Sequence, residues 1–334
     1  MSKAKILVTG GAGYIGSHVV KALKQVQKPV LTIDNLSTGY QQAVTFGKFI
    51  KMDLGEEQKL ESIFKENEIE SVFHFAGSII VPESVERPMK YYQNNTSNSQ
   101  NLIKLCLEHN VKNFIFSSTA AVYGNVKEGV CHEDTPTSPL NPYAWSKLMT
   151  EQMLSDAQKS KPDFNYVALR YFNVCGADPE GEIGQAFPGA THLIKVNVEA
   201  AQGKRDKTYI YGTDYPTKDG TGVRDYIHVK DLASAHIEAF KFLEKEKRSE
   251  TFNCGYGQGH SVKEVIDAVK RVTKVDYPVI EEKRRAGDGA KIVADNKKIL
   301  SQTEWKIEHN NLDQIILDAF KWEGSERLKS WTSR

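Results

Sequence analysis

Two side chains that could transfer a proton, Tyr143 and Lys147, lie four residues apart in the segment Asn-Pro-Tyr-Ala-Trp-Ser-Lys. Residues at this spacing share one face of a helix, so the phenol and the ammonium would point the same way. A free phenol ionises at about pH 10 and is a poor base at neutral pH. A nearby cation favours the phenolate and brings the pKa of the phenol into a useful range. The pair therefore predicts an enzyme that uses a tyrosine as its base.

A glycine-rich segment near the start of the chain predicts a nucleotide-binding loop. Gly10, Gly13 and Gly16 follow the apolar run 6–8 and precede a helical pattern. Glycines permit a tight turn and let a pyrophosphate approach the backbone at the N-terminus of a helix. A glycine turn without a ligand is the alternative, and the strand–loop–helix context favours a dinucleotide site.

An acidic residue further along the chain indicates which dinucleotide to expect. Asp34 ends the next apolar run, where a carboxylate can accept hydrogen bonds from ribose hydroxyls and would repel a 2′-phosphate. The sequence therefore favours NAD over NADP, and the same carboxylate could also stabilise the turn 34–36. Taken with the glycine loop, Tyr143 and Lys147 indicate a nicotinamide enzyme.

Three further strand ends could contribute to the same site. Residues 53–54, 75–77 and 117–119 each follow an apolar run, and ligands bind open α/β sheets outside the carboxyl ends of the strands. A hydroxyl from the Ser-Ser-Thr segment 117–119 could hydrogen-bond a substrate oxygen and share a proton with Tyr143. Serine and threonine more often cap loops and helices, but the order of the motifs favours the catalytic role.

These groups are positioned by alternating strands and helices. Expected strands are 5–9, 29–34, 49–52, 71–75, 113–117 and 166–170, and expected helices are 15–27, 56–67, 89–109 and 143–160. The alternation predicts an α/β fold with a doubly wound parallel sheet of the Rossmann type.

From about Cys175 the sequence becomes turn-rich, and a smaller C-terminal α/β substrate domain is expected. Helices are expected there at 192–202, 229–245, 261–273 and 312–321. We expect residues 1–174 to form the NAD-binding domain and residues 175–334 to form mainly the substrate domain. Some segments of the second part could return to the first.

The composition argues against several other classes of protein. The chain has 334 residues, of which 40% are apolar and 26% charged, and its net charge is 44 − 43 = +1, so neither nucleic acid nor an anionic membrane is an expected partner. The cysteines are far apart and the nine histidines show no metal-binding spacing, so no disulfide scaffold or metal site is expected. The start lacks the apolar stretch of a signal peptide and no run could span a membrane, so we expect a soluble cytoplasmic protein.

The motifs together resemble the extended short-chain dehydrogenase/reductase family, and within it the UDP-galactose 4-epimerases. The resemblance extends from the first strand to residue 288 and covers nearly the whole chain. It is carried by the segments 9–18, 74–77, 116–124, 142–147, 169–173, 219–229 and 284–288. Segment 219–229, Asp-Gly-Thr-Gly-Val-Arg-Asp-Tyr-Ile-His-Val, is the most specific of them.

The resemblance implies a role for each candidate site residue. Tyr143 would be the base, Lys147 would bind the nicotinamide ribose and lower the pKa of the phenol, and Thr119 would bond the sugar O4. Contacts with NAD are implied for Gly10, Gly13, Tyr14, Ile15, Gly16, Asp34, Asn35, Leu36, Ser37, Thr38, Gly39, Asp53, Leu54, Phe75, Ala76, Gly77, Ser78, Asn94, Tyr143, Lys147 and Phe172. Contacts with the UDP-sugar are implied for Thr119, Tyr143, Asn173, His192, Leu193, Tyr209, Ile210, Tyr211, Arg224, Arg285 and Asp288.

The implied reaction is epimerisation at C4 of a UDP-hexose, without net oxidation. Tyr143 removes the O4 proton while a hydride passes from C4 to NAD, the 4-keto sugar turns about its diphosphate link, and the hydride returns to the other face. Arginines would hold the diphosphate because their charged forks bind its oxygens in pairs. The resemblance also implies a homodimer in which the helices 89–109 and 143–160 form a four-helix bundle.

Three positions depart from the commonest pattern of these enzymes. Ile79 stands where some of them have a lysine near the diphosphate, and His192 stands where asparagine is common. Ile292 lies where the size of the side chain correlates with acceptance of N-acetylated sugars. Activity on a UDP-N-acetylhexosamine, a UDP-pentose or a UDP-uronate therefore stays open.

Two other functions compete with epimerisation. A 4,6-dehydratase needs carboxyl groups directly after the strand-end threonine, where this chain has Ala120 and Ala121, which cannot transfer protons. A protein that only senses NAD would keep the glycine loop without needing Thr119, Tyr143 and Lys147 together. The sequence therefore favours the epimerase.

Overall fold

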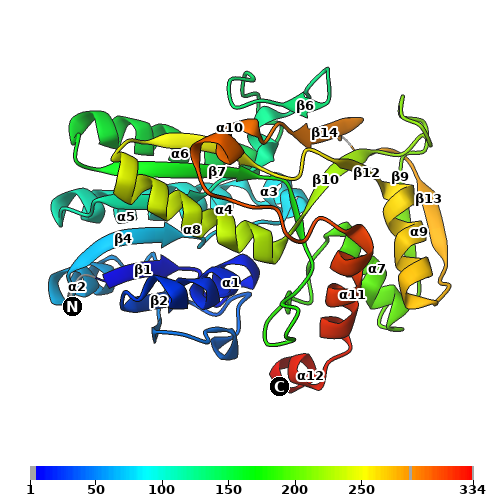
Figure 1. Cartoon of the computed structure of the whole chain (residues 1–334), viewed down its shortest axis with the longest axis horizontal. Coiled ribbons are helices and arrows are strands. Elements are labelled where there is room, and N and C mark those ends of the chain that lie inside the picture. The colour runs from blue at the N-terminus through cyan, green and yellow to red at the C-terminus, as the bar shows by residue number, and fades with distance from the viewer. Residues whose placement is uncertain (1–4, 286–287, 333–334) are drawn as a thin grey trace.

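The computed structural model describes residues 5–285 and 288–332 of the 334-residue chain, and within them the largest sheet has seven parallel strands (Figure 1). The strand order is β11-β7-β5-β4-β1-β2-β3. The strands are β1 (Lys5–Thr9), β2 (Val30–Asp34), β3 (Lys48–Lys51), β4 (Ile69–His74), β5 (Asn113–Ser117), β7 (Asn165–Tyr171) and β11 (Glu250–Cys254). The strands expected in the first half are confirmed to within two residues at each end, and β11 lies outside the expected set.

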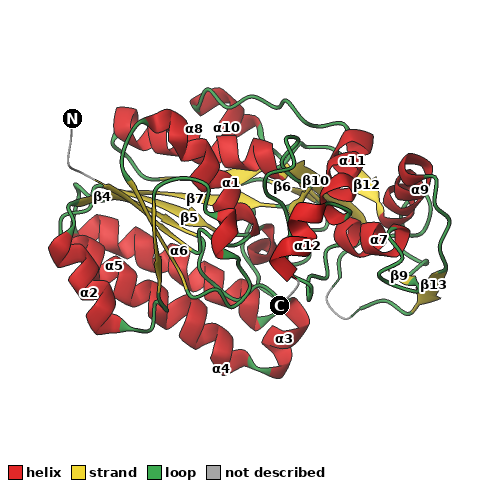
Figure 2. Cartoon of the chain, turned by 90° about the horizontal axis from the view of Figure 1, so that it is seen from below, coloured by secondary structure: helices red, strands yellow, loops and turns green. Residues whose placement is uncertain are grey.

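Helices cover both faces of this sheet, as Figure 2 shows. One face carries α1 (Tyr14–Ala22) and α8 (Val229–Glu246), and the other carries α2 (Glu57–Glu66), α5 (Asn98–Glu108) and α6 (Pro142–Ser160). Buried apolar side chains fill the space on both sides of the strands, as expected for a parallel sheet. The doubly wound α/β fold predicted from the sequence is confirmed.

The helix expected over 89–109 contains an irregular turn. This helical stretch follows the short helix α3 (Val81–Glu86). It consists of α4 (Pro88–Tyr91), the π-helical segment η3 (Tyr92–Ser97) and α5. The π-helical segment places the side-chain oxygen of Asn95 on the N–H of Ser78 at 2.7 Å and its amide on the Ser78 carbonyl at 3.0 Å. The irregular turn thereby ties the loop after β4 to the helical layer, and such turns are frequent at functional sites.

Short single turns of 3₁₀ helix complete the first part of the chain. They are η1 (Leu23–Val26), η2 (Gln41–Ala43) and η4 (Ala120–Tyr123). The first of them continues α1, so the helix expected over 15–27 is α-helical only to Ala22. It ends at Gln27, whose φ of 57° leaves the helical region.

A smaller lobe, mostly at the right of Figure 1, carries most of the remaining elements. Its main sheet has the order β12-β10-β14-β6 with β8 beside β10, and a separate pair joins β13 to β9. The strands are β6 (Val130–Cys131), β8 (Asn173–Cys175), β9 (Thr208–Tyr211), β10 (Val223–His228), β12 (Gly259–Ser261), β13 (Val279–Glu282) and β14 (Lys291–Ala294). The helices are α7 (Leu193–Ala201), α9 (Val262–Thr273), α11 (Leu312–Glu323) and α12 (Glu326–Thr332). All helices expected after Cys175 are confirmed to within two residues at each end.

The chain passes between the two lobes several times. Helix α8 and strand β11, which follow residue 174, complete the first sheet and its helical layer. Helix α10 (Lys297–Gln302) packs beside β11. In the other direction, β6 from the first half of the chain pairs with β14. Segments on both sides of the boundary expected at residue 174 therefore take part in the other lobe.

Some expectations from the sequence fall on residues that the structure does not describe. Ala286 and Gly287, part of the segment 284–288, lie outside the described residues, as do residues 1–4 at the start of the chain. All four cysteines lie in the described part, and each is free and buried. Among the described helices, none combines the length and the apolar character that crossing a membrane requires.

Candidate active site

The glycine loop lies between β1 and β4, where the winding of the sheet reverses direction. Gly10 has a φ of 71°, and a Cβ atom there would lie 2.5 Å from the backbone nitrogen of Ala76. Glycine satisfies both conditions, so the loop after β1 can pass directly against the loop after β4. Ligands of open α/β sheets bind in the crevice at such a point.

A cavity of about 1870 Å³ opens from this crevice and is lined by both lobes. It contains most of the candidate site residues: Gly10, Gly13, Tyr14, Ile15, Gly16, Asp34, Asn35, Ser37, Thr38, Asp53, Leu54, Phe75, Ala76, Gly77, Ser78, Asn94, Thr119, Tyr143, Lys147, Phe172, Asn173, His192, Leu193, Tyr209, Tyr211, Arg224, Arg285 and Asp288. Leu36, Gly39 and Ile210 lie outside this lining. Leu36 forms the turn after Asp34, Gly39 packs against Ala12, and Ile210 belongs to the apolar core of the second lobe.

The first turn of α1 suits an anionic ligand. Its N-cap is Gly13, no side chain within the described residues caps it, and its first turn contains no acidic residue. The first backbone N–H groups of a helix lack partners inside the helix, and the helix dipole places partial positive charge there. These features fit the pyrophosphate of a dinucleotide.

Asp34 is held in a fixed position at the end of β2. The N–H groups of Ala12 and Leu36 donate to its two carboxylate oxygens at 3.0 and 2.8 Å. Burial raises the pKa of Asp34, and these two hydrogen bonds act against the rise. Both oxygens keep further acceptor capacity for ribose hydroxyls.

The start of α6 determines where Tyr143 and Lys147 lie. The side chain of Asn141 accepts the N–H of Ala144 at 2.9 Å, and Pro142 occupies the first turn. An asparagine cap followed by proline is a strong start signal for a helix. The helix therefore begins directly before Tyr143 and turns both proposed catalytic side chains toward the end of β5.

Lys147 is buried against the end of the sheet. Its ammonium donates to the carbonyl of Ser117 at 2.9 Å and lies 5.0 Å from the centre of the Phe116 ring. Burial lowers the pKa of Lys147 to about 8, while the charge of Glu151 acts in the opposite direction. One N–H of the ammonium is thus used by the strand end, and the ammonium can direct the others into the cavity that Lys147 lines.

Tyr143 lies beside Thr119 in the cavity. Burial raises the pKa of the Tyr143 phenol, and the hydrogen bond with Thr119 lowers it. Thr119 is itself fixed, because its hydroxyl accepts the N–H of Ala121 at 3.1 Å. The rings of Tyr143 and Tyr91 pack edge to face with their centroids 6.5 Å apart. A phenol in these surroundings needs an added positive charge to ionise near neutral pH.

A buried polar network behind Lys147 was not anticipated from the sequence. Glu151 accepts hydrogen bonds from Arg170 at 2.6 and 3.0 Å and from the hydroxyl of Ser118. Arg170 also donates to the Tyr123 hydroxyl at 3.1 Å. The network holds the strand end that carries the candidate hydroxyl group. The spacing of Glu151, four residues after Lys147 on one helix face, indicates a carboxylate near the ammonium, but not its contacts with Ser118 and Arg170.

Arginine and aromatic side chains form the wall that the second lobe contributes. The guanidinium carbon of Arg285 lies 3.7 Å from the centre of the Tyr211 ring. Arg224 lies 3.9 Å from the carboxylate of Asp288. Burial lowers the pKa of His192, so this ring is neutral near pH 7. The wall therefore offers cationic forks and ring faces to a ligand.

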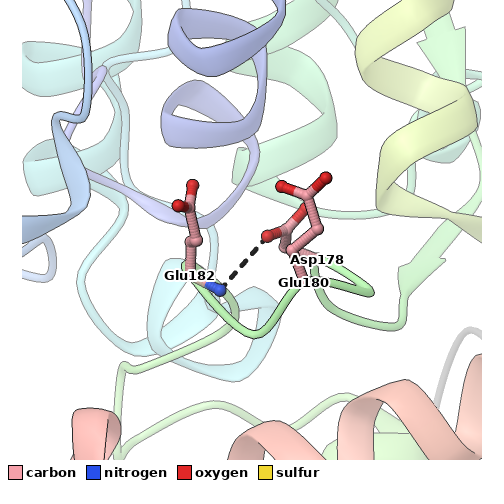
Figure 3. A group of neighbouring side chains, drawn as sticks. All are labelled: Asp178, Glu180 and Glu182. Carbon is pink, nitrogen blue, oxygen red and sulfur yellow. Dashed lines mark hydrogen bonds between the residues drawn. The ribbon is translucent and has the colours of Figure 1, made fainter.

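Three carboxylates gather beside α1 and share one cation. Asp178, Glu180 and Glu182 approach one another closely enough to hold a metal ion (Figure 3). The Lys21 ammonium lies 2.9, 2.7 and 2.9 Å from an oxygen of each in turn, and the N–H of Glu182 donates to Asp178 at 3.1 Å. We interpret the group as an ion-pair network that fastens the loop after β8 to α1.

The fold and the cavity define a class of protein. A glycine loop at the reversal point of the sheet, a carboxylate at the end of β2, and Tyr143 with Lys147 beside the end of β5 are the parts of a nicotinamide-dependent short-chain dehydrogenase/reductase. Residues 6–255 match the model of the NAD dependent epimerase/dehydratase family. The chain belongs to this family.

Individual relatives are similar over nearly the whole chain. The chain is 48% identical over 322 residues to the UDP-glucose 4-epimerase of Azospirillum brasilense, with 96% of this chain and 92% of the relative covered. The structure of the UDP-Glc/GlcNAc 4-epimerase from Campylobacter jejuni is 47% identical, with a TM-score of 0.85 and 96% and 99% of the chains covered. The structure of UDP-glucose 4-epimerase from Bifidobacterium longum in complex with NAD⁺ and UDP is 38% identical, with a TM-score of 0.90 and 96% and 98% covered.

Proposed function

We propose that this protein is an NAD-dependent 4-epimerase that interconverts UDP-galactose and UDP-glucose. The observation that carries the proposal is that one cavity contains the glycine loop, Tyr143 with Lys147, and the guanidinium groups of Arg224 and Arg285. These groups suit a dinucleotide, a proton transfer and a diphosphate, respectively. The similarity to the UDP-glucose 4-epimerase of Azospirillum brasilense supports the same activity.

The first lobe, mainly residues 1–174, would bind NAD. The N-terminus of α1 would hold the pyrophosphate, Asp34 the ribose of the adenosine, and Lys147 the ribose of the nicotinamide. The residues fit this ligand, because no described side chain caps the first turn of α1 and the Asp34 carboxylate is already oriented beside the glycine loop. Bound NAD supplies the hydride acceptor and donor that inversion at C4 requires.

Tyr143 is the proposed base for the sugar O4. Its phenolate oxygen would take the O4 proton and later return it, so no acid or base is consumed over one turnover. Thr119 would orient O4, and its hydrogen bond with Tyr143 supports this role. Lys147 would favour the phenolate, since a nearby cation lowers the pKa of a phenol.

The second lobe, mainly residues 175–334, would hold the UDP part of the substrate. Arg224 and Arg285 would bind the diphosphate, with Tyr211 and Asp288 beside them. Because the anchor is the diphosphate, the hexose can turn about its link and present either face of C4 to Tyr143. The same anchor keeps the 4-keto sugar from leaving before the exchange is complete.

A second candidate substrate is a UDP-N-acetylhexosamine. Ile292 lines the cavity and packs on the apolar cluster that contains Phe172. An aliphatic side chain at this point is smaller than an aromatic one and leaves more room beside the sugar. The 47% identical structure from Campylobacter jejuni is of a UDP-Glc/GlcNAc 4-epimerase, which is the observation that favours this candidate.

Turnover by the purified protein tests these assignments. UDP-galactose, UDP-N-acetylgalactosamine, a UDP-pentose and UDP-glucuronate should each be incubated with the protein, and the 4-epimers separated and quantified. We expect the fastest conversion with UDP-galactose, and bound NAD that is unchanged in amount after many turnovers. A protein that binds NAD and converts none of these sugars would refute the proposal.

We further propose a cytoplasmic homodimer that acts in galactose metabolism. Support for the dimer comes from exposed apolar side chains on neighbouring helices: Val85 is 63% exposed on α3, Met89 69% on α4, and Trp145 42% and Met149 39% on α6. These helices lie together on one side of the molecule, at the bottom of Figure 2. Clustered apolar side chains on a surface commonly mark a subunit interface.

A further inference from the structure

The segment 35–43 runs across the glycine loop. It begins directly after Asp34, and the N–H of Tyr40 donates to the Ala12 carbonyl at 3.1 Å. Gly39 lies so close to Ala12 that a Cβ atom would come within 2.6 Å of its backbone. Exposed Ser37 and Thr38 line the cavity between these two anchor points. The segment therefore covers the end of the cavity where the adenosine half of a dinucleotide lies.

Helix α12, near the other end of the chain, packs on the segment 35–43. Trp331, on helix α12, stacks on the ring of Tyr40 with centroids 6.0 Å apart and an angle of 29° between the ring planes. Only 4% of the Trp331 surface is exposed, and the side chain lines the same cavity. Figure 1 shows α12 as the red helix below α11, beside the C-terminus.

Trp331 is fixed in turn by the second lobe. The rings of Trp331 and Trp322 pack edge to face with their centroids 5.1 Å apart. The indole N–H of Trp322 donates to the Gln185 carbonyl at 3.2 Å, and Leu328 belongs to the same buried apolar cluster. The position of the Tyr40 ring thus depends on a helix nearly three hundred residues away in the sequence.

We propose that Tyr40 and Trp331 form a clasp that holds the segment 35–43 over the adenosine end of the site and slows the release of NAD. The inference rests on the NAD site proposed above and adds two residues to it that the sequence motifs do not include. Breaking a stacked ring pair requires neither lobe to unfold, so the clasp can open while the rest of the site keeps its shape.

The rate at which NAD leaves the protein tests the clasp. The protein is loaded with radiolabelled NAD, freed of excess by gel filtration, and mixed with unlabelled NAD, and the bound label is followed with time. We expect Trp331→Ala to release NAD about tenfold faster, the scale of one aromatic pair. Trp331→Phe, which keeps a ring at this position, should restore most of the retention.

Matched variants separate the clasp from a general effect of the helix. Arg327→Ala changes an exposed residue of α12 and should release NAD at the parent rate. Tyr40→Ala should match Trp331→Ala, and the double variant should be no faster than either single one. If Trp331→Ala does not fold, the rate of NAD release from Tyr40→Ala tests the clasp instead. Parent-like release from Tyr40→Ala or Trp331→Ala, or additive effects of the two, would overturn the proposal.

The release experiment contains no sugar, so it does not depend on the epimerase activity. A parent protein that retains NAD but converts no UDP-sugar would contradict the proposed function and leave the clasp intact. An active parent whose Trp331→Ala variant holds NAD as long as the parent does would contradict the clasp alone.

Discussion

The charged ammonium of Lys147 is buried in the protein, and neighbouring polar and acidic groups stabilise it there. The Ser117 carbonyl accepts one of its hydrogens, and Glu151 supplies opposite charge one turn further along α6. Glu151 is held by Arg170, so charges of both signs alternate behind the site. A buried charge is stable only where partners of this kind are in place. The network therefore helps to keep Lys147 protonated, because burial alone would lower the pKa of Lys147 further.

Replacing the proposed base gives the most direct prediction at this scale. Tyr143→Phe keeps the ring that packs on Tyr91 but loses the proton acceptor, so turnover of UDP-galactose should fall by about 10²- to 10⁴-fold. The amount of NAD bound after purification should stay at the parent value. Tyr166→Phe, on β7 and outside the cavity, is the control and should leave turnover unchanged. Full activity of Tyr143→Phe would show that another group is the base.

The sequence predicts the contacts of some single residues better than those of others. Tyr143 and Lys147 lie on one helix, so their spacing alone predicts that their side chains meet at one site. Ser118 and Arg170 come from other elements, and their contacts with Glu151 depend on how α6 packs against β5 and β7. No local pattern carries that information, so the network became visible only in the structure.

At the scale of elements, the turn after β1 depends on a glycine for two separable reasons. Gly10 and Gly181 both have a φ of 71°, but a Cβ at Gly181 would meet no described atom within 4 Å, whereas one at Gly10 would collide with the loop after β4. Gly181→Ala should therefore lose only about 1 kcal/mol of unfolding free energy, the cost of the left-handed backbone.

Gly10→Ala should lose more unfolding free energy than Gly181→Ala, because the two loops must separate. It should also bind NAD more weakly, since the loop that we propose receives the pyrophosphate would move. Urea denaturation and NAD titration of both variants measure the two effects. Equal losses in both variants would show that the close approach to Ala76 has no energetic consequence.

Strand β10 contains a buried carboxylate with a pH-dependent contribution to stability. Asp225 is fully buried and accepts N–H groups from Tyr256, Gly257 and Ala294, which tie β10 to its neighbours. Burial raises its pKa to about 6, and the three hydrogen bonds act against the rise. An unfolded aspartate has a pKa of about 3.9, so between about pH 4 and 6 the folded protein binds more protons than the unfolded chain. The contribution of Asp225 to the unfolding free energy therefore falls as the pH rises through this interval.

Asp225→Asn cannot titrate, so its unfolding free energy relative to the parent should rise between about pH 4 and 6. Urea denaturation at several pH values measures the difference. The control is Asp276→Asn. The Asp276 carboxylate is exposed, and the hydrogen bond from Lys270 lowers its pKa. Its relative stability should change slightly in the opposite direction. A difference for Asp225→Asn that stays flat or falls with pH would contradict the raised pKa.

The elements that the sequence predicts are those with a strong local pattern. Long amphipathic helices such as α8 and buried strands such as β5 were expected nearly to the residue. Strands β6, β8 and β12 contain two or three residues each, which is too short for any periodicity to appear. Their pairing is set by neighbours that arrive from distant parts of the chain, so the sequence predicts helices of the second lobe but none of its strands individually.

At the scale of the whole molecule, the exposed apolar side chains of α3 and α4 predict association. The double variant Val85→Asp/Met89→Asp places charges where an interface between two copies would exclude water, so it should be monomeric at concentrations at which the parent is a dimer. Sedimentation equilibrium measures the state. Leu300→Asp changes a side chain of α10 that is 41% exposed on the opposite helical layer, and it should leave the dimer intact. A parent that is monomeric at all concentrations would refute the dimer.

Helices α8 and α10 and strand β11 come from the second half of the chain but pack in the larger lobe. Neither half of the chain therefore contains a complete hydrophobic core by itself. A fragment ending at residue 174 would expose the edge of β7 that β11 pairs with and the apolar face that α8 covers. Unfolding of either lobe would strip the other of strands or helices, so the molecule should lose its structure in a single cooperative step. The two proposed ligand sites therefore depend on one folding event, and no single cut should yield a separate nucleotide-binding module.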